Sequence, residues 1–466
     1  MLSLIIIPIS IIIFLKLNRN YQLVIFSIAA LYPMSFGNLG SIPDFLVIDW
    51  LAIVVFLSLI NQLVPLYTVN KKIKTLKFKG IGIFIFALSI LIIWVIVSYV
   101  NNEILSHKFI IGPKTGIIRT YFNIFNSILI FFTTIIYFTT QYEKIEVENF
   151  LKSILYITLI IGFVRTFTLY FQVNTPLMSG YFNYNTMGAV NAGGVTQRFS
   201  GLDYAATIGI PALYGLHIYK NKTNLFLLLI FLIFLFLSAS RTAMVGFSLS
   251  VIIFSFLFLP KNLIYLTVTA CILFLVVVLF LPESFYQGQI TRVSTFQQKG
   301  FMGVDVGRGM AWKLHLKNFM AHPIFGKGIS DYSGFIYSPI PNIETFVREQ
   351  LFSGGHGAYF SLLGTLGIGG ITYFLIMVYG GIILSFKKIK QYAAFDQDKT
   401  AIAIFCFMLL LIAAVWVVTG PNALSDVQYI FYIVGLICAI RVMENSPEKI
   451  QNKNEKYSSK IEINNY

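Results

Sequence analysis

The stretch TAIAIFCFMLLLIAAVWVVT, residues 400–419, decides the fold class of this chain. It carries no charged side chain, and an apolar run of about 20 residues has the length of an α-helix that crosses a membrane. Charged residues make up only 11% of the whole chain, whereas soluble domains carry roughly 25%. Water is therefore not the main solvent of this protein.

Similar apolar runs follow one another along the chain. Only helices and closed barrels satisfy their backbone polar groups in lipid, and runs of this length exclude a barrel. We therefore expect an all-α, polytopic membrane protein with about 12–13 transmembrane helices. The candidate spans are residues 2–16, 20–36, 45–66, 80–100, 117–139, 150–172, 202–219, 223–237, 241–259, 262–282, 357–386, 400–419 and 424–441.

The remaining segments define the domain organisation. We expect one membrane domain over residues 1–443, which includes a large polar loop at 282–355. A tail at 444–466 is poor in apolar residues and is expected to be disordered and cytoplasmic. The N-terminus lacks a basic segment and a cleavage site, so the first run is interpreted as a retained helix and not as a signal peptide. The cysteines all lie in apolar runs, where they offer neither a disulfide framework nor a metal-binding pair: Cys271, Cys406 and Cys438.

The formal net charge of +15 is distributed unevenly. Lysines gather in connections such as NKKIKTLKFK (70–79) and FKKIK (386–390), which alternation assigns to one side of the membrane. This is the positive-inside pattern of cytoplasmic loops, so the charge indicates topology and not nucleic-acid binding. Alternation then places the 174–199 loop, the Ser240–Arg241 turn and the 282–355 loop together on the exoplasmic face.

The polar loop contains a predicted amphipathic helix over residues 308–321, ended by Pro323. Lys313 and Lys317 are expected on its polar face, and such a helix would lie at the membrane surface. Its apolar face would be formed by residues at helical spacing: Met310, Leu314, Leu316 or Phe319, and Met320.

Three arginines are predicted at exoplasmic ends of different segments: Arg198, Arg241 and Arg308. A guanidinium group is permanently charged and binds phosphate oxygens in a bidentate manner. Arginine near hydrocarbon is costly and usually has a partner, so these three together could clamp a pyrophosphate. The alternative for any one of them is that it reaches the lipid headgroups or pairs with an acid, and we assign Arg165 to that class.

His356 follows two glycines and precedes a third, at the start of an expected span. Its imidazole could take a proton from a hydroxyl nucleophile, and the alternative is an interfacial histidine bonded to backbone. His322 precedes a proline and is expected to serve a turn. The sequence contains no P-loop, HExxH or GxSxG pattern, which argues against ATP hydrolysis, zincin and serine-hydrolase chemistry. The sparse acidic residues of the outer loops form no DxD pair, which argues against metal-dependent transfer from a nucleotide sugar.

Three stretches, in this order, resemble the O-antigen ligase and Wzy O-antigen polymerase superfamily: SASRTAMVGF (238–247), GRGMAWKLHLKNFMAHPIFGKGISDY (307–332) and HGAYFSLLGTLGIGG (356–370). In that family a Ser-x-Ser-Arg element opens a membrane helix. A periplasmic loop then carries an arginine and His-Pro-x-x-Gly-x-Gly, and a histidine starts the next helix. The matching positions here are Ser238, Ser240 and Arg241; Arg308 with Trp312; His322, Pro323, Gly326 and Gly328; and His356, with Gly367 at the family's spacing.

The resemblance implies a GT-C-like fold in the bacterial inner membrane, with its active site facing the periplasm. It implies a glycosyltransferase of lipopolysaccharide biosynthesis that takes a glycan from undecaprenyl pyrophosphate without a metal or other cofactor. The acceptor would be a lipid-linked repeat unit for a polymerase, our leading hypothesis, or lipid A–core for a ligase. A chain-length regulator and a flippase would be its membrane partners, with no nucleic acid.

The resemblance also implies residue roles. Arg198, Arg241 and Arg308 would hold the pyrophosphate, and His356 would orient or deprotonate the acceptor hydroxyl. Substrate-binding roles are expected for Arg292, Lys313, Lys317, His322, Ser240 and Trp312, although Trp312 stands where leucine is common in the family. A transporter of lipid-linked oligosaccharide and a glycan-binding scaffold remain alternatives. The transporter would need internal symmetry and polar residues along its helices.

Overall fold

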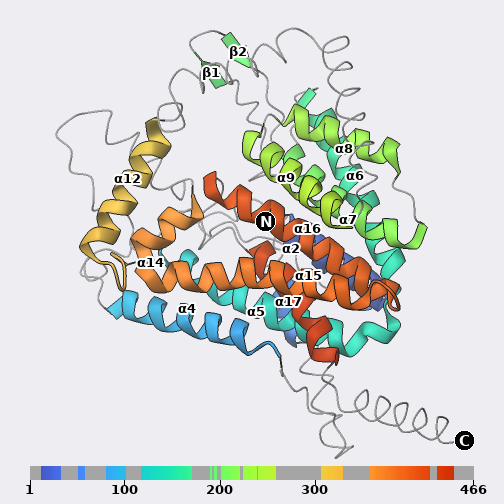
Figure 1. Cartoon of the computed structure of the whole chain (residues 1–466), viewed down its shortest axis with the longest axis horizontal. Helices are drawn as coiled ribbons and strands as arrows, with labels where there is room; N and C mark the ends of the chain where they lie inside the picture. Colours follow the sequence, from blue (N-terminus) through green and yellow to red (C-terminus); the bar gives the residue numbers. More distant parts are fainter. Residues whose placement is uncertain are drawn as a thin grey trace, which may run out of the picture.

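A computed structural model gives the arrangement of the chain (Figure 1). It describes residues 12–32, 51–57, 80–100, 117–170, 189–191, 194–196, 201–220, 224–238, 240–258, 306–328, 357–419 and 428–444. The helices are α2 (Arg19–Leu31), α4 (Gly82–Val100), α5 (Ile117–Gln141), η2 (Tyr142–Lys144), α6 (Val147–Tyr170), α7 (Leu202–Lys220), α8 (Leu225–Leu237), α9 (Arg241–Phe258), α12 (Val306–Ala321), α14 (Ala358–Leu375), η5 (Ile376–Gly380), α15 (Gly381–Tyr392), α16 (Gln397–Thr419) and α17 (Gln428–Glu444). Strands β1 (Ala189–Asn191) and β2 (Gly194–Thr196) form a small antiparallel hairpin.

The chain is an all-α polytopic membrane protein, as the apolar runs predict. Wherever the structure describes a candidate span, that span is helical. By length and composition, four helical stretches within the described residues could cross a membrane: Asn123–Gln141, Val147–Phe167, Ala358–Tyr392 and Gln397–Val418. The span at 262–282 lies outside the described residues, as does most of 2–16, so the number of spans stays a prediction.

Helix α16 lies at the centre of the bundle and packs against α7, α9 and α15. Most of its side chains are buried, including Phe405, Met408 and Leu410, which are completely inaccessible. Helix α17 packs on α5, and α14 packs on α4 and α12. An apolar helix surrounded by other apolar helices explains why residues 400–419 contain no charge.

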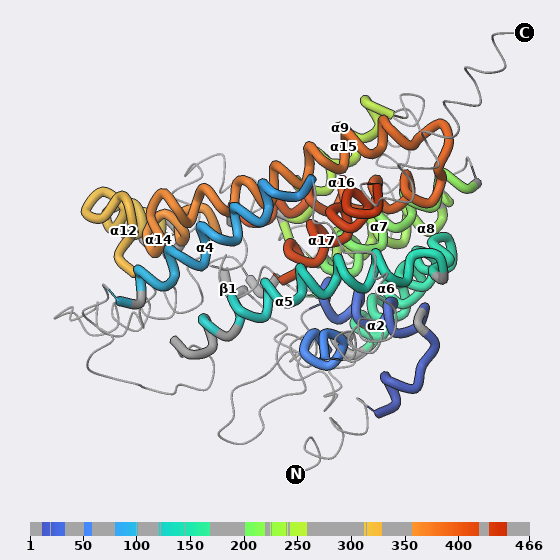
Figure 2. The backbone as a smooth tube through the Cα atoms, turned by 90° about the horizontal axis from the view of Figure 1, so that it is seen from below, coloured from blue at the N-terminus to red at the C-terminus, as the bar shows by residue number. Residues whose placement is uncertain are grey.

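Helices α14, η5 and α15 form one continuous rod, with α4 beside it (Figures 1 and 2). Gly369 lies against Trp94, and Gly380 lies against Phe84, so α4 runs antiparallel to the rod. The rod contains a π-helical turn at Ile376–Gly380 and a break at Gly367, described below. It ends at Tyr392, six residues beyond the predicted end of the span at 386, because the lysine-bearing segment continues the helix.

The bundle has two ends. We call the end where α7, α9 and α14 begin and α16 finishes the loop end, because α12 lies there. We call the opposite end, where α15 and α17 finish, the tail end. The start of α12, the Ser240–Arg241 turn and the start of α14 share the loop end, as the alternation of spans predicts. Glu444, expected to begin the tail, is the last residue of α17.

Candidate active site at the loop end

The last turn of α16 is the point at which the loop-end elements meet. A methyl group added at Gly357, just before α14, would lie 2.7 Å from Trp312 Nε1 of α12 and 2.9 Å from the carbonyl oxygen of Val418 in α16. The Trp312 ring also stacks on Phe360 of α14, with ring centroids 4.9 Å apart. The starts of α12 and α14 are therefore joined to each other and to the end of α16.

Helix α9 reaches the same place from another side. A methyl group at Gly246 would lie 3.2 Å from the carbonyl oxygen of Ile412, and the Phe258 ring meets the Phe407 ring edge-on. Position increases along α9 as it decreases along α16, so the two helices are antiparallel. Arg241 begins α9, and its backbone is consequently level with the last turn of α16.

Helix α7 completes the junction. The Tyr204 ring, in its first turn, packs on Trp416 of α16 at a centroid distance of 4.6 Å. Arg198 lies outside the described residues, four positions before Leu202, the first residue of α7. Arg292 and His356 also lie outside the described residues, and His356 is the residue before Gly357 in the sequence.

Arg308 lies in the first turn of α12, four residues before Trp312. Four residues correspond to about one helical turn, or ~5.4 Å along the axis. The backbones of Arg241 and Arg308 therefore lie near the end of α16. The directions of their side chains, and hence their roles, remain predictions.

The Ser-x-Ser-Arg element forms the tight connection between α8 and α9. The Ser238 hydroxyl donates to the Leu235 carbonyl at 2.6 Å and accepts from the Ser240 amide at 3.2 Å. The Ser240 carbonyl accepts the first helical bond of α9, from the Met244 amide. These bonds end one helix and start the next, and they give both serines a structural role at the head of α9.

Three helix starts, those of α7, α9 and α14, lie at the loop end. Backbone N–H groups at a helix start have no intrahelical acceptor, and the helix dipole gives them about half a positive charge. Phosphate groups bind at such positions in many proteins. Because α8 and α16 end here with their carbonyl groups, an anion would be bound by the free amides of an individual helix start and not by the bundle as a whole.

A second contact fixes the far end of α12 to α14, and we call it the clasp (residues 322–328 against 364–368). The Lys327 and Gly328 amides donate to the Gly364 and Thr365 carbonyls at 2.9 Å, and the Ile368 amide donates to the Pro323 carbonyl at 2.9 Å. Trp94 of α4 adds a bond from its Nε1 to the Ile324 carbonyl at 2.8 Å. The His-Pro-x-x-Gly-x-Gly motif thus forms a backbone connection between the loop and the membrane helices.

The clasp requires glycine on both sides. Gly367 has φ 59° and ψ −146°, which breaks α14, and an added methyl group would lie 2.5 Å from the Ile324 carbonyl oxygen. At Gly326, with φ 68°, a methyl group would lie 2.4 Å from the backbone of Thr365. Side chains other than hydrogen are strained in these conformations, so the family's glycine spacing has a backbone cause here.

The helix predicted at 308–321 is confirmed as α12, but the predicted division of its faces is wrong, because Leu316 and Met320 lie on the same side of the helix as the two lysines. Trp312, His315 and Asn318 are buried, whereas Leu316 is 37% exposed and Met320 is 73% exposed. The buried face packs on α14, where the His315 ring lies against Gly364, a residue without a side chain. Burial lowers the pKa of His315 from 6.5 to about 4, because an imidazolium ion would lose its hydration there.

The exposed face of α12 carries Lys313 and Lys317. Lys313 and Lys317 therefore lie on a different side of α12 from the buried Trp312, and the structure does not bring the three side chains together. His322 is exposed at the end of α12, and its amide and carbonyl take part in the turn, as predicted. Whether any of them binds substrate remains a prediction.

Two features of the loop end escaped the sequence analysis. Arg165 of α6 is only 2% exposed, and the Asp203 carboxylate of α7 acts on it electrostatically, so its charge has an acid nearby. The sequence analysis assigns Arg165 to the arginines that pair with an acid or reach the lipid headgroups, and this pairing agrees with that assignment. Asp203 also acts on Tyr32, whose ring packs on Tyr204. No sequence pattern links these residues, which come from three separate helices.

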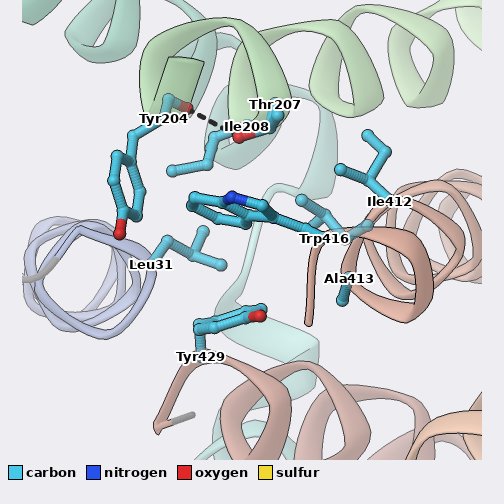
Figure 3. A pocket seen from close by; sticks show the side chains of 9 residues that line it. Leu31, Tyr204, Thr207, Ile208, Ile412, Ala413, Trp416 and Tyr429 are labelled. Carbon is cyan, nitrogen blue, oxygen red and sulfur yellow. Dashed lines mark hydrogen bonds between the residues drawn. The ribbon is translucent and has the colours of Figure 1, made fainter. Parts of the chain in front are cut away.

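The other feature is an aromatic pocket beside this pair, shown in Figure 3. It is small, with room for about one water molecule. Trp416 lies between the Tyr204 and Tyr429 side chains, with its ring 6.1 Å from that of Tyr429. The pocket is lined by Leu31, Tyr204, Thr207, Ile208, Leu409, Ile412, Ala413, Trp416 and Tyr429.

Within the described ranges, no three His, Cys, Asp or Glu side chains gather where they could hold a metal ion. The curated proteins contain no match to the chain. A family described as O-antigen ligase matches residues 226–375, from α8 to the end of α14. This range contains Arg241, Trp312 and Gly357, which belong to the elements that meet at the loop end, and it also contains the clasp. This part of the chain is therefore similar to the O-antigen ligase family, which supports the resemblance to the superfamily of O-antigen ligases and polymerases.

Proposed function

We propose that this protein is an O-antigen polymerase, which transfers a glycan from undecaprenyl pyrophosphate to a lipid-linked repeat unit. The observation that carries the proposal is the meeting of α9, α12 and α14, all within the family's range, at the last turn of α16. The alternative is the ligase reaction, with lipid A–core as acceptor, which the family's description also favours. The junction would serve either acceptor.

The charge balance of the loop end supports an anionic donor. The described residues there include one acid, Asp203. The basic residues of the same end are Arg119, Arg165, Arg241, Arg308, Lys313, Lys317 and Lys327. In a region with this excess of positive charge and three helix starts, a pyrophosphate would find favourable electrostatics without a metal.

In the proposed reaction, Arg198, Arg241 and Arg308 neutralise the pyrophosphate as negative charge develops on it. The acceptor hydroxyl oxygen forms a bond to the anomeric carbon of the donor glycan. The bond from that carbon to the pyrophosphate oxygen breaks, and its electron pair leaves with the pyrophosphate. His356 takes the hydroxyl proton, and the configuration at the anomeric carbon inverts in this single step.

Trp312 would act in this reaction as a positioning residue. Its ring is buried against Phe360 and Gly357, one turn after Arg308 and next to the residue that follows His356. It would fix the separation between the proposed clamp and the proposed base. Arg292 and His322 are proposed to contact the glycan outside this junction.

The test is expression in a bacterial strain that lacks its own O-antigen polymerase, followed by sizing of the surface glycan. A restored ladder of glycan lengths is expected for the polymerase. Single repeats capped on lipid A–core, without a ladder, would support the ligase. No change in either readout, from protein present in the membrane, would overturn both.

His356→Ala should abolish the product, because loss of a general base costs roughly 10²- to 10⁴-fold in rate. His217→Gln is the matched control, since His217 lies near the tail end of α7 and should leave the product unchanged. A ladder of full intensity from His356→Ala, at equal protein level, would favour a glycan-binding scaffold over an enzyme.

A further inference from the structure

The outward face of α12 differs from a typical solvent-exposed helix face. Lys313, Leu316, Lys317 and Met320 follow the i, i+3, i+4, i+7 spacing that places residues on one side of a helix. All four are exposed, with Met320 at 73%. This side is opposite the one that packs on α14, so it alternates basic and large apolar residues on a surface that the bundle does not cover.

The clasp extends this surface. Ile324 is 57% exposed and Phe325 is 37% exposed, and together with the four residues of α12 they form what we call the α12 outer face. Lys327 lies close by, since its pKa is lowered by burial and by the positive charge of Lys317. No acidic residue occurs in the described segment 306–328, so the surface is basic as well as apolar.

The contact with α4 gives the position of this face relative to lipid. The Phe325 ring packs on Trp94 at a centroid distance of 5.4 Å, and Trp94 donates to the Ile324 carbonyl. Trp94 belongs to an uncharged apolar helix whose neighbouring side chains Ile93 and Ile96 are more than half exposed. An exposed apolar stripe on such a helix faces lipid in a membrane protein, and tryptophan prefers the membrane–water interface.

We propose that the α12 outer face binds the anionic phospholipids of the membrane leaflet at the loop end. Leu316, Met320, Ile324 and Phe325 would enter the region of the first acyl carbons, beside the stripe of α4. Lys313 and Lys317 would reach the headgroup phosphates. Apolar residues with lysines and no acid are the composition of interfacial helices, whereas lysine is depleted in interfaces between proteins.

This assignment gives the two lysines a role distinct from the proposed donor clamp. The donor also carries phosphates at headgroup height, so one phosphate chemistry has two sources. The outer face is assigned to the phospholipids because its residues point away from the junction of Trp312 and Gly357. The assignment goes beyond the proposed reaction and does not depend on it.

The test uses the full-length protein with a nitroxide spin label at Met320→Cys, in lipid nanodiscs that contain no polyprenyl phosphate. Accessibility of the label to oxygen and to a water-soluble nickel chelate is measured with phosphatidylcholine alone and with added phosphatidylglycerol. We expect a label shielded from nickel, and more so with phosphatidylglycerol. Lys313→Gln/Lys317→Gln should weaken the phosphatidylglycerol dependence by about fivefold per lysine.

The matched control is Lys387→Gln/Lys390→Gln, which removes two exposed lysines at the tail end and should leave the label at position 320 unchanged. A label that is equally accessible to nickel in both lipid mixtures would overturn the proposal. So would shielding that appears only when another membrane protein is added. Because no donor or acceptor is present, either result leaves the proposed glycan transfer untouched.

Discussion

The two ends of the helix bundle differ in how far their charges are paired within the protein. At the tail end, Glu444 accepts hydrogen bonds from Lys388 at 2.6 Å and from Arg441 at 2.9 Å, and Asp398 accepts one from Tyr219 at 2.5 Å. All described acidic residues except Asp203 lie at this end: Glu143, Glu146, Glu148, Asp396, Asp398 and Glu444. At the loop end, basic residues face a single described acid.

We infer from this difference that the charges of the tail end contribute to stability and those of the loop end to function. Charges that are paired within the protein stabilise the ends of helices where they leave lipid, and they require no ligand. An excess of one sign costs free energy by repulsion unless an opposite charge arrives from outside. We therefore expect substitutions at the tail end to change stability, and substitutions at the loop end to change glycan transfer or lipid contact.

The largest effect on stability is expected from Lys388→Met. The Lys388 side chain is 3% exposed and that of Glu444 is 12% exposed, so the substitution leaves a poorly hydrated carboxylate with one basic partner fewer. Loss of a partner from a buried pair costs about 3–5 kcal/mol. The double variant Lys388→Met/Glu444→Leu should recover most of this loss in thermal unfolding in detergent. Equal instability of the two variants would mean that the pair is not what stabilises this end.

The largest effect on activity is expected from Arg241→Ala, at about 10²- to 10³-fold, the usual cost of removing one group that stabilises transition-state charge. Arg441→Ala removes the same side chain at the tail end and should leave transfer unchanged. Both are measured as the rate of glycan-ladder formation at equal protein level. A similar loss of rate in the two variants would show that the two ends do not differ in function.

The clasp is tested by Gly367→Ala. The substitution forces an alanine into a conformation with φ 59° and against the Ile324 carbonyl, and we expect it to weaken docking of α12 on α14 by about 3 kcal/mol. Gly82→Ala is the control, because nothing lies within 4 Å of its added methyl group. Hydrogen exchange of the α12 amides reports docking, and unchanged protection in Gly367→Ala would contradict the assigned role of the clasp.

The effect of pH on α12 develops only in acid. His315 has a pKa of about 4 when α12 is docked, against 6.5 when it is exposed, so the undocked state binds the extra proton between these values. Docking is therefore strongest above pH 6.5 and weakens as pH falls towards 4, by up to about 3 kcal/mol at 1.36 kcal/mol per pH unit. Exchange protection of α12 should follow this course, and His315→Gln should flatten it. His322→Gln, which alters an exposed imidazole on the same segment, should leave the pH dependence in place.

The helical spans and α12 could be predicted because they depend on apolar length and on turn-forming residues such as Pro323. Which face of α12 packs against the protein could not be predicted, because a helix buries its more apolar face in the protein only where its other face is in water. Leu316 and Met320 lose little by exposure if lipid surrounds them, while the glycine-rich surface of α14 accepts the flat rings of Trp312 and His315. The position of the break in α14 was equally hidden, since GTLGIGG contains several glycines and the clasp selects Gly367 among them.

The candidate site was predicted in part. Arg198, Arg241, Arg308 and His356 were chosen from residue type and from the family pattern. The backbones of Arg241 and Arg308 lie at the same end of the bundle, whereas Arg198 and His356 lie outside the described residues, so the roles of all four stay predictions. Trp416 and Asp203 were not foreseen, because a tryptophan in an apolar span and an acid in a first helical turn are common. Their importance follows from contacts between α7, α6 and α16, which no spacing within one segment encodes.

The rod from Ala358 to Tyr392 is 35 residues long, or roughly 50 Å at 1.5 Å per residue. The hydrocarbon core of a membrane is about 30 Å thick, and even a tilt of about 40° leaves the rod several ångströms too tall for it. With its tail end at the opposite surface, the rod raises the segment before Gly367 above the acyl chains. In the proposed polymerase reaction, a growing polysaccharide could then leave sideways along the membrane surface.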